Sequence, residues 1–401
     1  MQSNCDICII GNGAIGKAAA LGFAQAGASV TLLDALPAFA APDPASAAQQ
    51  WDLRVYAINP HARALLTGLR VWDALDASRV MAVDAMVVEG DAGPRAGRLE
   101  FDSYAARTDA LAWIVEDRNL NHALDSALNF SVNVRRVNGT AVTMHSNAAA
   151  NVVTLANGDR IVAELIVGAD GAHSWVRAQT GIDIDYRPYG QRAVVANFTC
   201  EKPHRGVARQ WFSATEGIIA LLPLAGERVS LVWSAPDALA AVLLEETAAA
   251  LAARVSAYCQ APLGMLAPLD AAGAKAIALA MLRPHTITAP RVALIGDAAH
   301  VVHPLAGQGM NLGFADVTAL LQVVAERGAH RDRGDSRVLA RYARERKESI
   351  LLMHLATDGL QRLFSSDTEP LRIARNIGLD LVNRLPFLKR QLITQALGNK
   401  A

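Results

Sequence analysis

The sequence predicts an α/β fold: a parallel sheet with glycine-rich turns, an inserted β-rich region and a helical C-terminal region. Three glycine-rich segments, at residues 11–16, 168–171 and 296–311, indicate this organisation. Each follows a short apolar run of the strand type, and the first and last lead into helix-favouring sequence. The length of 401 residues suits about two domains.

The elements follow in order along the chain. Residues 8–10 form a buried strand, 17–25 an Ala-rich helix that Gly27 ends, and 29–33 a second strand with Asp34 at its end. Residues 52–75 indicate a strand end leading into a helix, 86–101 hairpin strands and 118–128 a helix. Asn157-Gly158 predicts a hairpin between 152–155 and 160–162, and 165–167 is a buried strand. Residues 192–233 are strand-rich, 239–258 helical, 292–295 a buried strand, 311–324 a helix, and most of the remainder is helical.

Composition limits the class of protein. Hydrophobic residues make up 52% and charged residues 19%, which fits a globular protein and excludes a disordered one. The formal net charge of +0 gives no overall attraction for nucleic acid. The first apolar run leads directly into the glycine turn, which argues against a signal peptide, and no apolar run reaches the roughly 20 residues that span a bilayer. We expect a cytoplasmic protein, or one peripheral at the inner face of a membrane.

The four cysteines are few and scattered, which indicates a reducing compartment without a disulfide framework. Cys5 and Cys8 form a C-x-x-C pair that could be a redox pair or half a zinc site. Residues three apart on a strand face opposite sides, so we favour two small strand residues.

The first glycine cluster predicts a dinucleotide site. Gly11 makes the tight turn after the strand, Gly13 lets a pyrophosphate approach the backbone, and Gly16 lets the helix pack closely. The helix N-terminus then offers free N–H groups to the phosphates. Asp34, at the end of the second strand, is placed to bond a ribose hydroxyl.

The later glycine segments point to FAD rather than to a nicotinamide cofactor held by one Rossmann half. Asp297 follows a buried strand and could accept a hydrogen bond from a ribityl hydroxyl. Gly307 and Gly309 precede a helix whose N-terminus would stabilise the negative charge of a reduced flavin. Purely structural glycine turns are the alternative in each case.

His300 and His303 suggest a metal pair by their spacing, but Pro304 makes a regular helix unlikely there and no third ligand is apparent. We therefore favour histidines that structure the loop. Arg54 and Arg118 fall near element boundaries, where arginine suits phosphate contacts; surface or ion-paired arginine is the alternative.

At this point the residues carry a resemblance. The sequence resembles the FAD-dependent aromatic hydroxylases of the p-hydroxybenzoate hydroxylase type, the class A flavin monooxygenases, and more closely their ubiquinone-biosynthesis subgroup. The resemblance covers essentially the whole chain and is carried by residues 11–16, 52–54, 114–118, 168–174, 339–342, 386–389 and above all 303–313. One departure is Asp34, where the family more often has Glu, so the ribose contact would be longer or bridged by water.

The resemblance implies a Rossmann-like FAD-binding domain of the glutathione-reductase type, formed by residues 1–75, 102–180 and 283–335. It implies a substrate domain at 76–101 and 181–282 and a C-terminal helical region at 336–401. The implied FAD-binding residues are Gly11, Gly13, Ala14, Ile15, Gly16, Asp34, Arg54, Arg118, Asp170, Asp297, Pro304, Gly307, Gln308, Gly309, Met310 and Asn311. Asp170 belongs to a motif thought to serve both FAD and NAD(P)H. Candidates for the substrate pocket are Trp211, Leu222 and Pro304, with sheet core as the alternative for each.

The activity implied is hydroxylation of an aromatic ring with NAD(P)H as a transient co-substrate and O2. The favoured substrate is a polyprenyl phenol of ubiquinone biosynthesis. The alternatives are a soluble aromatic or secondary metabolite, and a non-enzymatic flavin-containing lipid escort. The sequence identifies no catalytic residue. The apolar stretch 377–397, with Arg384, Lys389 and Arg390, packs on the body, contacts a membrane surface or docks a partner such as another quinone-biosynthesis protein. A homo-oligomer also remains open.

Overall fold

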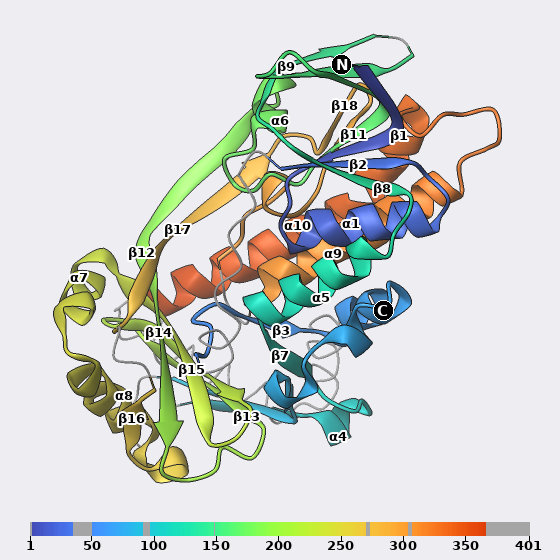
Figure 1. Cartoon of the computed structure of the whole chain (residues 1–401). Coiled ribbons are helices and arrows are strands. Elements are labelled where there is room, and N and C mark those ends of the chain that lie inside the picture. The colour runs from blue at the N-terminus through green and yellow to red at the C-terminus, as the bar shows by residue number, and fades with distance from the viewer. Residues whose placement is uncertain are drawn as a thin grey trace.

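The first large sheet, seen at the top of Figure 1, contains the predicted parallel strands and adds antiparallel strands. The computed structural model describes residues 2–34, 50–90, 97–147, 149–269, 273–303 and 307–365. The sheet has the order β18 (Thr288–Ala289), β19 (Val292–Leu294), β11 (Arg160–Gly168), β1 (Gln2–Ile10), β2 (Val30–Asp34) and β8 (Val134–Asn138), with β10 (Asn151–Leu155) pairing β11 and β9 (Ala141–Ser146). The antiparallel strands are β9, β10 and β18. Strand β1 runs parallel to both β2 and β11, which places the turns after β1 and β11 at one edge.

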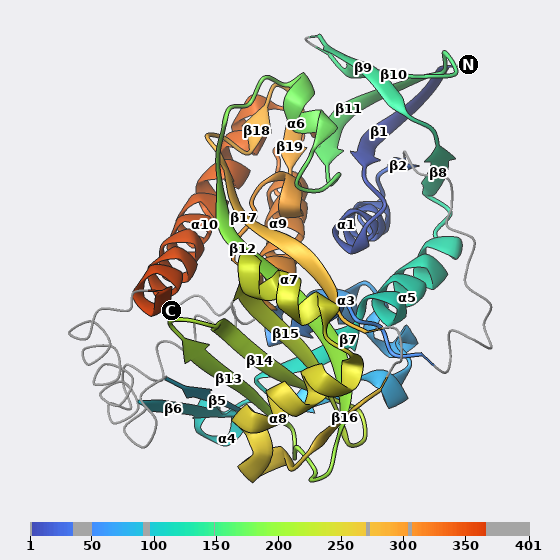
Figure 2. The same cartoon turned by 90° about the vertical axis from the view of Figure 1, so that its left-hand side faces the viewer.

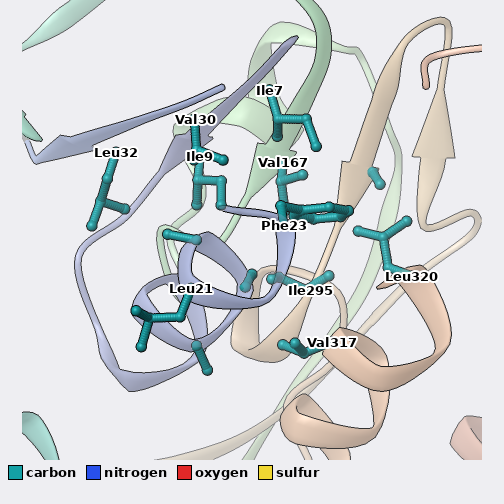
Figure 3. Packing of buried hydrophobic residues seen from close by; sticks show 14 of the residues in the cluster. Ile7, Ile9, Leu21, Phe23, Val30, Leu32, Val167, Ile295, Val317 and Leu320 are labelled. Carbon is teal, nitrogen blue, oxygen red and sulfur yellow. The ribbon is translucent and has the colours of Figure 1, made fainter. Parts of the chain in front are cut away.

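Helices cover this sheet and complete its core. Helix α1 (Ala14–Gln25) follows β1, and α9 (Gln308–Ala325) and α10 (Ser336–Ser365) come from the far end of the sequence. Helix α5 (Asp117–Asn129) lies beside α1. Figure 3 shows Ile7 and Ile9 of β1 packed with Phe23 of α1 and with Val317 and Leu320 of α9. This core therefore joins the two ends of the chain around the glycine turns.

The second large sheet comes from the inserted region. Its order is β16 (Leu266–Pro268), β12 (Ile184–Cys200), β15 (Arg228–Pro236), β14 (Gly217–Leu224), β13 (Val207–Ser213), β5 (Ala85–Glu89) and β6 (Arg98–Asp102), with β17 (Lys275–Pro284) on β12. Helices α7 (Asp237–Glu245) and α8 (Ala248–Leu263) cover its outer face in Figures 1 and 2.

A three-stranded sheet lies against the inner face of the second sheet. It has the order β3 (Val55–Ile58), β7 (Ala112–Glu116) and β4 (Met81–Val83). The remaining described elements are α3 (Pro60–Gly68), α4 (Ser103–Ala106), α6 (Trp175–Gln179) and the short 3-10 helices η1 (Trp72–Ala74), η2 (Ala77–Arg79) and η4 (Gly296–Ala298). Hydrophobic contacts that include Ile114, Ala57 and Leu222 join this small sheet to the second sheet.

The α/β fold class predicted from the sequence is confirmed. The opening strand, helix and strand and the hairpin at Asn157-Gly158 form as expected. Several boundaries differ. Strand β1 begins at Gln2 rather than at residue 8, and α1 begins at Ala14, directly after the turn. Residues 160–162 and 165–167 belong to one continuous strand, β11, and the helix expected at 239–258 is divided into α7 and α8. Within the described residues, no helix combines the length and apolarity needed to cross a bilayer. The stretch 377–397 lies outside the described residues.

Candidate functional site

The glycine turn after β1 is shaped by close backbone contacts. Gly11 has a φ of +118°, and a Cβ built there would lie 2.2 Å from the carbonyl oxygen of Ala169. A Cβ on Gly16 would lie 2.0 Å from the carbonyl oxygen of Gly11. Gly13 differs, because no heavy atom lies within 4 Å of its Cβ position. Two glycines thus allow the chain to pack, and the third leaves the outer side of the turn open.

The N-terminus of α1 suits an anion. Its N-cap residue is Gly13, no side chain caps it, and its first turn holds no acidic residue. Free N–H groups at a helix start bind phosphate, helped by the helix dipole. Asn12 Nδ2 donates to Asp34 Oδ2 at 3.0 Å, which ties the turn to the end of β2. The predicted residues Gly11, Gly13 and Asp34 therefore lie together.

Asp297 lies on the turn η4, which a buried carboxylate holds in place. Gly296 N donates to Asp316 Oδ2 at 2.9 Å, and His300 Nε2 lies 2.6 Å from the same oxygen. Arg346 Nε of α10 donates to Asp316 Oδ1 at 2.7 Å. Asp316 is completely buried; burial alone would raise its pKa, but His300 and Arg346 outweigh that effect and lower it. The turn is therefore anchored to α9 and α10 from behind.

Asp297 is exposed as a residue, yet the protein around it desolvates its carboxylate. Desolvation raises its pKa, while His300 and Arg54 act in the opposite direction. Arg54 is exposed at the start of β3, with its guanidinium 5.5 Å from the ring centroid of Tyr56. Desolvation lowers the pKa of Arg54, but Tyr56, Asp117, Asp297 and Asp52 together raise it. The structure therefore brings Arg54 and Asp297 into one electrostatic environment.

Two segments that the sequence singled out separately, 52–54 and 116–118, are held together by hydrogen bonds. Asp52 N donates to Glu116 Oε1 at 2.5 Å, and Asp117 N donates to the carbonyl oxygen of Arg54 at 2.9 Å. Arg118 N donates to Asp52 Oδ2 at 3.2 Å. Its guanidinium donates to the carbonyl oxygen of Gln50 at 2.7 Å. The two predicted arginines thus lie where neighbouring elements begin: Arg54 directly precedes β3, and Arg118 is the second residue of α5.

The second glycine segment begins α9. Gly307 has a φ of +67° and is the N-cap, again without a side-chain cap, and nothing lies within 4 Å of a Cβ on Gly309. Asn311 Nδ2 donates to the carbonyl oxygen of Ala57 at 2.7 Å, and its Oδ1 accepts from Asn59 N at 3.0 Å. Asn311 therefore joins α9 to β3 rather than pointing both polar atoms at a ligand.

Ile15 connects this segment with the first turn. A Cβ on Gly313 would lie 2.9 Å from Ile15 Cδ1, and one on Gly296 would lie 3.3 Å from Ile15 Cγ2. Ala14 is buried beside it at the start of α1. Gln308 and Met310 are half-buried in the first turn of α9. The three glycine segments are therefore neighbours in space.

The carboxylate of Asp170 is hydrogen-bonded within its own segment of the chain. Its carboxylate accepts from Ser174 Oγ at 2.5 Å and from Val176 N at 3.0 Å, at the start of α6. Its backbone N would lie 2.7 Å from a Cβ on Gly11. The backbone of residue 170 thus borders the site, whereas its carboxylate holds α6.

The substrate-pocket candidates lie on different faces of the second sheet. Leu222 is on the inner face and packs with Ala57 and Ile114 of the small sheet. Trp211 is on the outer face, 6.3 Å from the ring of Tyr258 on α8, and belongs to the core there. Leu222 therefore remains a candidate, while the position of Trp211 fits its alternative as sheet core. Pro304 lies outside the described residues.

The two histidines of the loop are fully enclosed and occupy separate environments. His303 Nε2 lies 3.1 Å from Gln191 Oε1, its ring packs edge-on against Tyr189, and burial lowers its pKa to about 4. His300 contacts Asp316. In the part of the chain that the structure describes, no cluster of three or more His, Cys, Asp or Glu residues could hold a metal ion.

Sequence reasoning missed several residues that shape this site: Lys17, Tyr56, Asp117, Asn121, Asp316 and Arg346. Tyr56 Oη donates to Asp117 Oδ1 at 2.6 Å, beside Arg54. One available signal was the lysine in an otherwise Ala-rich helix; another was the spacing of Asp117 and Asn121, which places them on one face of α5.

These features fit FAD. The uncapped start of α1 with the open side of Gly13 suits a pyrophosphate, and Asp34 suits a ribose. Arg54, Asp297 and the uncapped start of α9 form a second polar group close to the first.

Comparisons with known proteins agree with this geometry. The model of the FAD binding domain family matches residues 4–353. The chain is 36% identical over 398 residues to 3-demethoxyubiquinol 3-hydroxylase of Escherichia coli (strain K12), covering 98% of each chain. It is 34% identical to ubiquinone hydroxylase UbiL of Rhodospirillum rubrum, covering 98% of this chain and 89% of that protein.

Solved structures show the same fold at lower identity. PqsL, a probable FAD-dependent monooxygenase from Pseudomonas aeruginosa, superposes with a TM-score of 0.76 at 22% identity, covering 94% of this chain and 100% of that one. HpxO of Klebsiella pneumoniae, solved with FAD and uric acid, gives a TM-score of 0.74 at 18% identity with 97% of each chain covered. The chain therefore belongs to the FAD binding domain family, among the flavin-dependent aromatic hydroxylases that include the ubiquinone hydroxylases.

Proposed function

We propose that this protein is an FAD-dependent monooxygenase that hydroxylates the aromatic ring of a polyprenyl phenol in ubiquinone biosynthesis, with NAD(P)H and O2 as co-substrates. The observation that carries the proposal is the 36% identity to 3-demethoxyubiquinol 3-hydroxylase along nearly the full length of both chains. The grouping of Arg54 with Asp297 and of Gly13 with Asp34 supports it from the structure.

The chain's own groups would divide the binding work. In this proposal the N–H groups at the start of α1 bind the pyrophosphate and Asp34 the adenosine ribose. Asp297 accepts from the ribityl chain, and Arg54 supplies a positive charge nearby. The uncapped start of α9, at Gly307 to Asn311, stabilises negative charge on the ring system.

The flavin, when bound, supplies the redox chemistry by accepting electrons from NAD(P)H and activating O2. The inner face of the second sheet, with Leu222, would border the phenol and exclude water from the reacting ring. A phenol has an ordinary pKa of about 10, so a hydrogen-bond acceptor near its hydroxyl would help to activate the ring. The division into a FAD-binding domain at 1–75, 102–180 and 283–335 and a substrate domain at 76–101 and 181–282 stays a proposal.

The test uses purified protein loaded with FAD. We expect a prenylated phenol to stimulate NAD(P)H oxidation and to gain one oxygen atom, detected by mass spectrometry of the extracted lipid. Deletion of the gene in its host should leave a prenylated phenol that lacks one hydroxyl. If a soluble aromatic acid is hydroxylated instead and the deletion strain keeps normal quinone, the proposed substrate is wrong.

A further inference from the structure

A lysine is buried in α1, although the apolar core around it offers no reason for a charged residue there. Lys17 directly follows Gly16 and is 5% exposed. Its Nζ donates to Asn121 Oδ1 at 3.1 Å and to Asp125 Oδ2 at 2.8 Å, both on α5. Burying an ammonium group is costly unless it is paired and hydrogen-bonded, so these two bonds fix α5 against α1.

The hydrogen bonds continue from Lys17 to the opposite side of the site. Asn121 Nδ2 donates to Asp117 Oδ1 at 3.0 Å, and Tyr56 Oη donates to the same oxygen at 2.6 Å. The side chains of Lys17, Asn121, Asp117 and Tyr56 therefore form one unbroken chain across α1, α5 and β3. A short bond to a carboxylate is of the charge-assisted type, about twice as strong as a neutral one.

Tyr56 ends this chain beside Arg54. Among the described residues, no side-chain hydrogen bond or ion pair holds the Arg54 guanidinium. The guanidinium lies over the Tyr56 ring, 5.5 Å from the centroid, which is cation–π range. Asp297 raises the pKa of both Arg54 and Tyr56, so all three lie near one another. The Tyr56 ring therefore contacts the Arg54 guanidinium in the same electrostatic environment as Asp297.

We propose that Tyr56 is a cofactor-positioning residue: its hydroxyl, fixed by Asp117, orients the ring that supports Arg54, and the chain through Asn121 to Lys17 couples this support to the glycine turn. The inference rests on the proposed function, because Arg54 is taken to contact FAD. It assigns Tyr56 no step in the reaction. Its action is indirect, through the placement of one positive charge.

The test measures the FAD dissociation constant of four apoproteins by fluorescence titration: wild type, Tyr56→Phe, Arg54→Ala and the double variant. Phe keeps the ring and removes the hydroxyl. We expect Tyr56→Phe to raise the Kd by about three- to tenfold, the range for losing part of a charged hydrogen bond. We expect the double variant to match Arg54→Ala, because Tyr56 has nothing left to position. Tyr104→Phe is the matched control, since Tyr104 is 93% exposed, and it should bind FAD like wild type.

Two results would overturn the inference. One is a Tyr56→Phe protein with wild-type affinity and an unchanged spectrum of bound FAD. The other is a double variant whose loss of affinity is the product of the two single losses, which would show independent roles. If Tyr56→Phe lowers the thermal midpoint of the apoprotein, Asp117→Asn provides the second test. Its amide oxygen still accepts from Tyr56 without the charge, so its Kd should lie between those of wild type and Tyr56→Phe; equality with wild type contradicts the inference. Failure of wild type to bind FAD would instead refute the proposed function.

Discussion

Asp316→Asn tests whether the buried ion-pair cluster holds the Asp297 turn in place. The carboxylate is fully buried and contacts Gly296 N, His300 Nε2 and Arg346 Nε at 2.9, 2.6 and 2.7 Å. Asparagine keeps the size and one acceptor oxygen but removes the negative charge. The guanidinium of Arg346, which is 6% exposed, then stays buried without its anion.

The magnitude follows from that uncompensated charge. Removing one partner of a buried ion pair costs about 3–5 kcal/mol, and the retained oxygen places this substitution near the lower end, at about 3 kcal/mol. The loss has a second consequence, because the single amide oxygen of asparagine faces either Gly296 N or Arg346 Nε, and its NH2 group meets the other donor. One of the two bonds that tie the Asp297 turn to α10 through residue 316 is therefore broken. We therefore expect weaker FAD binding in addition to lower stability.

The assay is urea unfolding of the apoprotein, followed by FAD titration of the folded fraction. Asp185→Asn is the matched control, because Asp185 pairs with Arg283 at 2.6 Å on the surface, where ion pairs contribute little. It should change neither property measurably. If Asp316→Asn unfolds within about 1 kcal/mol of wild type, the cluster does not stabilise the fold as argued. If it loses stability but keeps full FAD affinity, the turn does not depend on Asp316.

The remaining predictions concern the turn, the histidines and the outer core. Gly13→Ala should keep the thermal midpoint and lose FAD affinity. Gly11→Ala should lower the free energy of unfolding by more than about 2 kcal/mol, because Gly11 has a φ of +118° and its Cβ would meet a carbonyl oxygen at 2.2 Å. Equal thermal midpoints for the two variants would contradict this. Burial lowers the pKa of both His303 and His354 to about 4, below the ordinary 6.5. The unfolded chain therefore binds protons first as pH falls, so stability is complete above pH 6.5 and declines toward pH 4 by up to about 1.4 kcal/mol per pH unit for each histidine. Urea unfolding across this range checks the slope, which His354→Gln should reduce. Trp211→Ala should cost about 3 kcal/mol of stability and leave the KM for a phenol unchanged; a raised KM would place Trp211 in the pocket wall.

Local signals in the sequence predicted the elements that hold the glycine turns. The strand, the turn and α1 are set by neighbouring residues, and the same applies to the Asn157-Gly158 hairpin. The contacts between distant segments were not predictable in this way. Tyr56 meets Asp117 61 positions later in the chain, and no local pattern specifies such a pairing.

Strand alternation also left one choice open. It shows that Trp211 and Phe212 face opposite sides of a sheet but not which side faces the cofactor. Helix α8 decides this by covering the side of Trp211. Likewise, the sequence identified Asp170 as a candidate site residue. It did not show that the Asp170 carboxylate accepts hydrogen bonds from Ser174 and Val176.

The most direct test of the account is an FAD titration of wild type beside Gly13→Val and Asp297→Asn, two single changes in segments far apart in the sequence. One FAD per chain should bind wild type, and each variant should bind it more weakly while unfolding at the same temperature. Two results would contradict a single site built from both segments. One is that wild type binds FAD tightly and only one of the two substitutions weakens the binding; the other is that wild type binds no FAD.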